Sequence, residues 1–81
     1  MKVKLNKEQY EFLRQHLANE RPELFGFFAD NNNYLFELDD ITAYRVRDWA
    51  GEKLQKEGFD INYELNEEGI ILEQLEDLFF E

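Results

Sequence analysis

The longest helical pattern in this chain is DDITAYRVRDWAGEKLQKEG, residues 39–58. Its small and branched apolar residues fall within about 80° of one another on a helical wheel, as a single buried stripe requires; they are Ala43, Val46, Ala50 and Leu54. Asp39 or Asp40 can cap the first turn, and Gly58 suits the position just beyond the last turn. The pattern therefore predicts a helix from about Asp40 to Glu57.

Apolar and polar residues alternate strictly in the segment that follows this helix. The apolar positions are Phe59, Ile61, Tyr63 and Leu65, and the polar positions between them are Asp60, Asn62 and Glu64. A period of two is typical of a strand with one buried face, although an ordered extended loop gives the same pattern. We therefore expect a strand over residues 59–65, with an ordered loop as the alternative.

A further helical pattern occupies the end of the chain. Asn66 is a good N-cap residue, and Glu67 and Glu68 favour the positive end of a helix dipole. The apolar residues that follow recur at helical spacing and form the expected buried stripe, which comprises Ile71, Leu72, Leu75, Leu78 and Phe79. These features predict a helix that begins just after Asn66.

Upstream of residue 39, the first helix has an unusually complete start signal. Asn6 is a favoured N-cap, and Gln9 stands at the position that completes a capping box. Pro22 disfavours a helical conformation for Arg21, the residue before it. The sequence therefore predicts a helix that begins after Asn6 and ends before Pro22.

The remaining segments read as strands. Residues 3–5 suggest a short edge strand, and residues 24–28 and 34–38 suggest an antiparallel hairpin that turns at Asn31 to Asn33, because asparagine tolerates turn conformations. The predicted fold class is α+β, with a small antiparallel sheet (a hairpin plus one or two further strands) packed against three helices in the order (β)αββαβα. Residues 1–81 are expected to be a single domain.

The C-terminal third also resembles a known family. Its residues Gly58, Phe59, Asp60, Tyr63, Glu68, Gly69, Leu72, Glu73, Leu75 and Asp77 follow a pattern of the form G-F-D-x-x-Y-x-x-x-x-E-G-x-x-L-E-x-L-x-D. This pattern is similar to the tail of a family of short uncharacterised bacterial proteins, in which threonine is expected where this chain has Asn66. The resemblance implies a bacterial origin and a small stand-alone domain, and it implies no activity.

The composition favours a folded chain without disulfides or membrane spans. Eight Phe, four Tyr and one Trp supply a large buriable surface, and there is no Cys. No apolar run approaches the roughly 20 residues that a membrane helix needs. The N-terminus becomes polar at Asn6, so that no signal peptide is expected and the default location is cytoplasmic.

The formal net charge of −10 is distributed unevenly along the chain. Residues 1–56 contain ten acids and nine bases, which gives −1, whereas residues 57–81 contain nine acids and no base, which gives −9. A field of this sign repels nucleic-acid phosphates and anionic lipids. We therefore expect no direct binding to nucleic acid or membranes, and the natural complement is a basic protein surface.

The sequence offers little for catalysis, metal binding or cofactors. Ser and Cys are absent, Thr42 is expected to support a helix cap, and His16 is expected to cover part of the core. In a calcium loop counted from Asp30, the sixth and twelfth residues would be Leu35 and Ile41 instead of Gly and Glu. We expect no enzyme activity, no metal and no cofactor, because a pair of catalytic carboxylates would need a deep cleft that so short a chain can hardly build.

The function favoured by these patterns is protein binding. An acidic C-terminal face would mask a basic surface of a partner, as immunity proteins, antitoxins or inhibitors do. The expected partner-binding residues are Glu67, Glu68, Glu73, Glu76 and Asp77, with Trp49 or Tyr63 as an anchor, although Trp49 is the better candidate for the core. Two alternatives stay open: the acidic face only keeps the chain soluble, or exposed aromatic residues make it a structural protein or a homodimer.

Overall fold

The computed structural model describes residues 1–29 and 33–80, and the chain forms two compact units, Met1–Thr42 and Ala43–Glu81. The described residues form helices and a two-stranded antiparallel sheet, which confirms the α+β class. The prediction that residues 1–81 are one domain stays a prediction.

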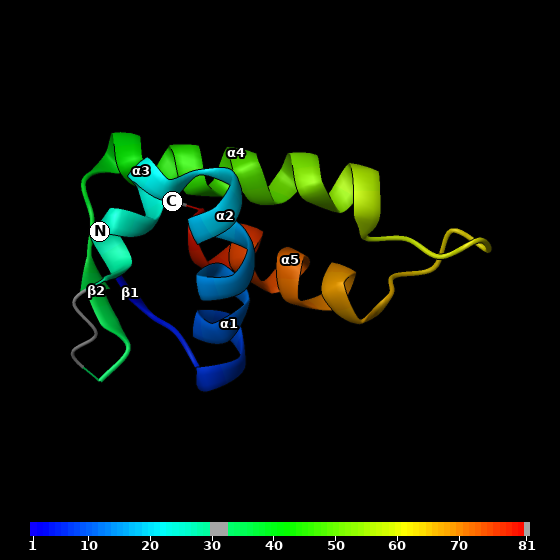
Figure 1. The fold of residues 1–81 in the computed structure, drawn as a ribbon, viewed down its shortest axis with the longest axis horizontal. Helices are drawn as coiled ribbons and strands as arrows, with labels where there is room; N and C mark the ends of the chain where they lie inside the picture. The colour runs from blue at the N-terminus through cyan, green and yellow to red at the C-terminus, as the bar shows by residue number, and fades with distance from the viewer. Residues whose placement is uncertain (30–32, 81) are drawn as a thin grey trace. The chain divides into compact units, whose positions relative to one another are not determined.

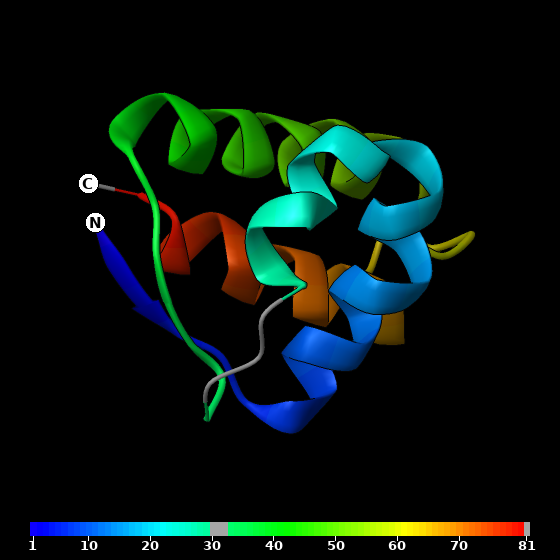
Figure 2. The same cartoon turned by 60° about the vertical axis from the view of Figure 1, so that its left-hand side comes forward.

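The sheet lies in the first unit. Strand β1 (Lys2–Lys4) pairs antiparallel with β2 (Leu35–Glu37), so that the two run side by side (Figure 2) and Val3 lies opposite Phe36. These two central residues are buried, and the strand residues on either side of them are exposed. The expected strands near residues 3–5 and 34–38 are therefore present, but they pair with each other.

The helix between these strands begins as predicted. In α1 (Lys7–Phe12), the Asn6 side chain accepts a hydrogen bond of 2.7 Å from the Gln9 backbone, and the Gln9 side chain accepts one of 3.0 Å from the Asn6 backbone. The helical path continues through a π-helical turn η1 (Leu13–Leu17) into α2 (Ala18–Glu20). It ends at Arg21, whose extended φ of −139° precedes Pro22, as the proline rule predicts.

The strand predicted over residues 24–28 is wrong. These residues form α3 (Pro22–Phe25) and the 3₁₀ turn η2 (Gly26–Phe28). Pro22 at the first helical position has a φ already suited to a helix, and Leu24 and Phe28 are buried at a spacing of four residues. The predicted hairpin therefore does not form, and most of its turn at residues 31–33 lies outside the described residues.

Helix α4 (Asp40–Glu57) matches its predicted bounds, and its residues from Ala43 onward belong to the second unit. Asp39 caps it, because the Asp39 carboxylate accepts a hydrogen bond of 2.6 Å from the backbone N–H of Thr42. The helix stops at Gly58, where an added Cβ would lie 2.4 Å from a Leu54 methyl group. Only glycine fits this position without displacing its neighbours.

Helix α5 (Glu67–Leu78) completes the second unit. It is capped by Asn66, whose side-chain oxygen accepts a hydrogen bond of 2.7 Å from the backbone of Gly69. Helices α4 and α5 lie side by side and run in opposite directions (Figure 1). The buried apolar residues of this unit come from both helices and comprise Ala43, Val46, Trp49, Ala50, Leu54, Leu72, Leu75 and Phe79.

Candidate functional site

The segment that joins α4 to α5, residues 58–66, forms an ordered loop that we call the α4–α5 loop. Its tip is a tight turn, in which the Tyr63 backbone N–H donates to the Asp60 carbonyl over 3.0 Å and the Asp60 N–H donates to the Glu64 carbonyl over 2.8 Å. The Asp60 carboxylate also accepts hydrogen bonds from the backbone of Asn62 (2.8 Å) and Glu64 (3.1 Å). One aspartate therefore holds the whole tip, as acidic residues at turns commonly do.

The base of the α4–α5 loop is fixed to the start of α5. Asn66 donates from its backbone to the Gly58 carbonyl (2.9 Å) and from its side-chain amide to the Glu57 carbonyl (2.8 Å). A Cβ added at Gly69 would lie only 2.1 Å from the Gly58 carbonyl oxygen, so the two backbones approach as closely as glycine permits. Asn66 thus caps α5 and anchors the loop at the same time.

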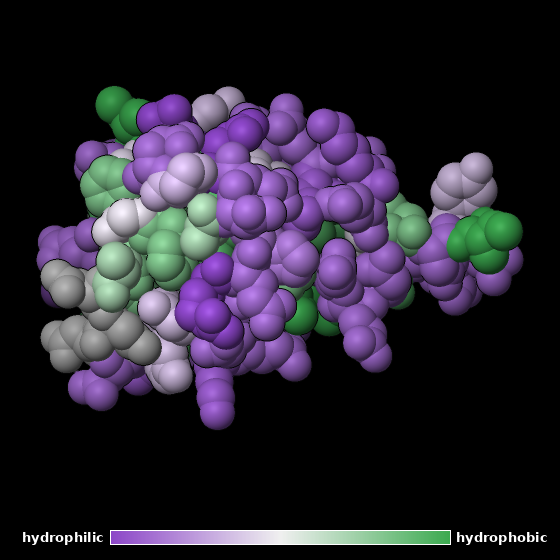
Figure 3. Space-filling model, in the orientation of Figure 1, coloured by the Kyte–Doolittle hydropathy of each residue, from purple (hydrophilic) through white to green (hydrophobic). Residues whose placement is uncertain are grey.

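The tip of the α4–α5 loop carries large apolar side chains in solvent. Ile61 is 93% exposed, Tyr63 is 88% exposed and Phe59 is 41% exposed. The loop extends beyond the ends of both helices (Figure 1), and its tip shows an apolar patch on a mostly hydrophilic surface (Figure 3). The strand predicted over residues 59–65 is therefore reduced to one bridge between Phe59 and Leu65, and the ordered-loop alternative is the correct one.

Tyr63 adopts a backbone conformation that is costly for its residue type. Its φ of 61° lies in the left-handed region, which costs a residue other than glycine about 1–2 kcal/mol. The exposed ring has little packing with which to offset this cost. Beside the ring lies a hollow of about 390 Å³ lined by Gln55, Lys56, Phe59, Asp60 and Tyr63.

The five carboxylates predicted to form one face of the last helix point in different directions. Glu67, Glu73 and Asp77 are exposed and fall within about 120° of the circumference of α5, a set that we call the acidic arc. Within the described part of the second unit, no lysine or arginine forms an ion pair with these three side chains. Glu68 is exposed in the first turn at about 100° from Glu67, and Glu76 is half-buried.

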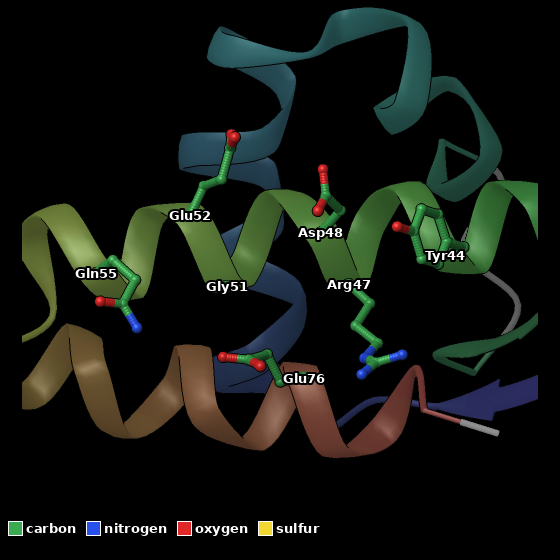
Figure 4. Close-up of a pocket in the computed structure, with 7 residues that line it drawn as sticks. All are labelled: Tyr44, Arg47, Asp48, Gly51, Glu52, Gln55 and Glu76. Carbon is green, nitrogen blue, oxygen red and sulfur yellow. The ribbon is translucent and has the colours of Figure 1, made fainter.

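Glu76 lines a groove between α4 and α5 that holds about 400 Å³. Figure 4 shows Glu76 pointing toward α4 and Arg47 pointing toward α5, whereas Asp48 and Glu52 point away from α5. The remaining lining residues are Tyr44, Gly51 and Gln55. The carbon of the Arg47 guanidinium lies 4.5 Å from the centre of the Phe80 ring, a cation–π contact at the end of the groove. The groove is therefore mixed in charge.

No arrangement of ligands for a metal occurs in the part of the chain that the structure describes: residues 1–29 and 33–80 contain no suitably placed group of three His, Asp or Glu side chains. Two ion pairs, Arg14 with Glu11 and Lys53 with Glu57, use none of the α5 carboxylates. Glu57, 55% exposed at its side chain, is the only member of either pair close to the α4–α5 loop in sequence. The negative charge of α5 is therefore not cancelled by these pairs.

The residues predicted as aromatic anchors have opposite environments. Trp49 is only 4% exposed and belongs to the core, so the suggestion that it anchors a partner is wrong. Tyr63 is accessible, as an anchor must be. His16 is half-buried with its ring 4.3 Å from that of Phe12, and Thr42 is buried in the first turn of α4.

The most exposed apolar residue of the tip, Ile61, was not among the predicted site residues. The alternation of residues 59–65 assigned it to the buried face of a strand. Asp60 and Asn62, which flank it, are both turn-forming residues, and this pair was the signal for a loop whose side chains all face solvent. Ile61 therefore joins Tyr63 as a candidate contact residue.

Among the described residues, no helix combines the length and the apolar character that a membrane span requires. Comparisons of the chain with models of protein families, with curated proteins and with solved structures give no match. The resemblance of the C-terminal third to short bacterial proteins therefore stays a prediction.

Proposed function

We propose that this chain is a non-enzymatic protein-binding module that masks a basic surface of a partner through its acidic C-terminal face, as immunity proteins, antitoxins and inhibitors do. The observation that carries the proposal is the acidic arc, in which Glu67, Glu73 and Asp77 are exposed on one side of α5. Residues 57–81 contain no lysine or arginine with which to neutralise it. A cytoplasmic location belongs to the same proposal.

Electrostatics explains what such a face would do. Exposed charges of one sign speed the encounter with an oppositely charged surface and select against partners of the same sign. Glu68 and Glu76, which lie to either side of the arc, would extend the field without defining its centre. Solubility alone would be served by a surface of mixed signs, such as residues 1–56 provide.

Binding is favoured over catalysis by the available side chains. Neither Ser nor Cys occurs in the sequence, and the one histidine, His16, packs its ring 4.3 Å from the ring of Phe12. The α4–α5 groove combines Arg47 with Glu76 on an open surface. Nucleophilic catalysis needs a nucleophile and a base held within hydrogen-bond distance, and these residues offer no such pair.

The proposal is tested by comparing two triple variants of equal charge. The first variant, Glu67→Gln, Glu73→Gln and Asp77→Asn, removes the acidic arc. The control variant removes three exposed carboxylates of the first unit, Glu8→Gln, Glu23→Gln and Glu37→Gln. The chain is immobilised, proteins from a lysate of the cells that produce it are applied at low salt, and the protein retained is eluted at 1 M salt and purified.

Association of this purified protein with the immobilised chains is then measured by surface plasmon resonance. We expect the arc variant to slow association about tenfold or more and the control variant to change it little, because steering depends on local charge. Equal slowing by both variants would show that only the net charge matters and would refute the proposed face. Retention of no protein at low salt would refute the proposed function itself.

A second candidate function, self-association, is favoured by one observation. Tyr44 and Phe80 are 61% and 59% exposed at the same end of the second unit, with Arg47 stacked over Phe80. Tyrosine and arginine are enriched at the centres of interfaces. Sedimentation equilibrium distinguishes this function: a dimer at micromolar concentration that dissociates in the Tyr44→Ser variant would support it, and a monomer at all concentrations would exclude it.

A further inference from the structure

We infer that the α4–α5 loop is the anchor of the proposed interface, and that Ile61 and Tyr63 enter an apolar cleft on the partner whose rim carries lysine or arginine. The inference rests on the proposed function and adds the contact residues and the kind of surface that receives them. It starts from the apolar tip visible in Figure 3.

The exposure of Ile61 and Tyr63 contributes nothing to the fold of the free chain. Burying a large apolar side chain stabilises a protein by about 1.5–3 kcal/mol, and both residues forgo almost all of this at 93% and 88% exposure. In an interface the same two side chains would recover it. They also differ in chemistry from the polar residues that surround them in the loop.

The tip is held in one conformation before any partner binds. Asp60 takes part in four hydrogen bonds within the turn, through its carboxylate and its backbone, and Asn66 fixes the base of the loop. A preformed loop loses little conformational freedom on binding, so more of the contact energy appears as affinity. The strained φ of Tyr63 indicates in the same way that the free chain is not optimised for its own stability at this residue.

The charges around the tip select the kind of partner. Asp60, Glu64 and Glu67 are exposed near it, and there is no basic residue from Glu57 to the end of the chain. An apolar anchor with a charged rim is the usual arrangement of an interface, and here the matching rim is positive. A second copy of the chain would bring like charges together across a symmetric interface, and an anionic lipid surface would be repelled.

The test uses the protein that the intact chain retains at low salt and releases at 1 M salt, purified as described above. Its affinity is measured for the full chain and for the single variants Ile61→Ser and Tyr63→Asn. We expect each variant to lose about tenfold or more in affinity, mainly through faster dissociation, as interface anchors do. Phe27→Ser, which removes a 52% exposed aromatic residue of the first unit, is the matched control and should bind as the intact chain does.

Folding failure is separated from loss of binding by thermal unfolding of each variant. Ile61 is too exposed for its replacement to affect folding, and asparagine suits the left-handed backbone at position 63. Unchanged affinity in both variants, with the acidic-arc variant still weakened, would overturn the anchor inference and leave the proposed function intact. Equal loss in the Phe27→Ser control would also overturn the inference. Unchanged binding by the acidic-arc variant would instead refute the proposed function.

Discussion

Replacing Tyr63 with asparagine is expected to stabilise the free chain, although it removes an aromatic ring. The φ of 61° costs tyrosine about 1–2 kcal/mol, and asparagine, which tolerates this region, should recover about 1 kcal/mol of that cost. Because the ring is 88% exposed, losing it should forfeit only about 0.3 kcal/mol of the 1.5–3 kcal/mol that full burial provides. The net gain is about 0.7 kcal/mol.

The assay is thermal unfolding followed by circular dichroism. For a chain of this size, about 1 kcal/mol shifts Tm by about 4–8 °C, so the Tyr63→Asn variant should melt about 3–6 °C higher. Tyr63→Ala is the matched control, because alanine also lacks the ring but keeps the unfavourable backbone, and its Tm should not rise. A fall in Tm for the asparagine variant would show that the ring packs in the folded state and would refute the account of a strained, exposed anchor.

Three further predictions concern the support of the loop and of α4. Gly69→Ala should lower the free energy of unfolding in urea by at least about 2 kcal/mol, because its Cβ would clash with the Gly58 carbonyl at 2.1 Å; an unchanged midpoint would refute this close approach. Asn66→Ala should cost about 1–2 kcal/mol in the same assay, since it removes both the α5 cap and the bond to Glu57, whereas Asn66→Asp should retain the cap. The hydrogen bond from the third backbone N–H of α4 lowers the pKa of Asp39, so its contribution to stability is complete above its unfolded pKa of about 3.9 and is lost as the pH falls through the lower folded value. Asp39→Ala should therefore flatten the pH dependence of Tm in that range, and an unaltered profile would contradict the assignment.

Local signals in the sequence predicted the helix boundaries well. Asn6 with Gln9, Asp39 and Asn66 all cap helices as expected, because a cap is a contact between residues three apart and needs no knowledge of the rest of the fold. Pro22 ended the first helical path as predicted. The same proline also began α3, and this second role was missed because the aromatic residues after it favour strands by composition.

The site was harder to predict because it depends on direction as well as sequence. Glu76 lies only about 40–60° from the buried Leu72 and Phe79 on the helical wheel, so its position beside α4 was within reach of the sequence pattern. The exposure of Ile61 was not, because alternation of period two describes a strand and an extended loop equally well. Which aromatic residues are buried, such as Trp49, is decided by packing across elements that the sequence does not specify.

The central claim is that an exposed, unneutralised carboxylate surface on α5 recruits a cationic protein. It is tested most directly by the association rate constant of the purified binding protein, measured from low ionic strength to 1 M salt, where the Debye length shrinks to about 3 Å. The account predicts a steep fall in this rate for the intact chain and a nearly flat profile when Glu67, Glu73 and Asp77 are neutralised. A salt-independent rate for the intact chain would contradict it.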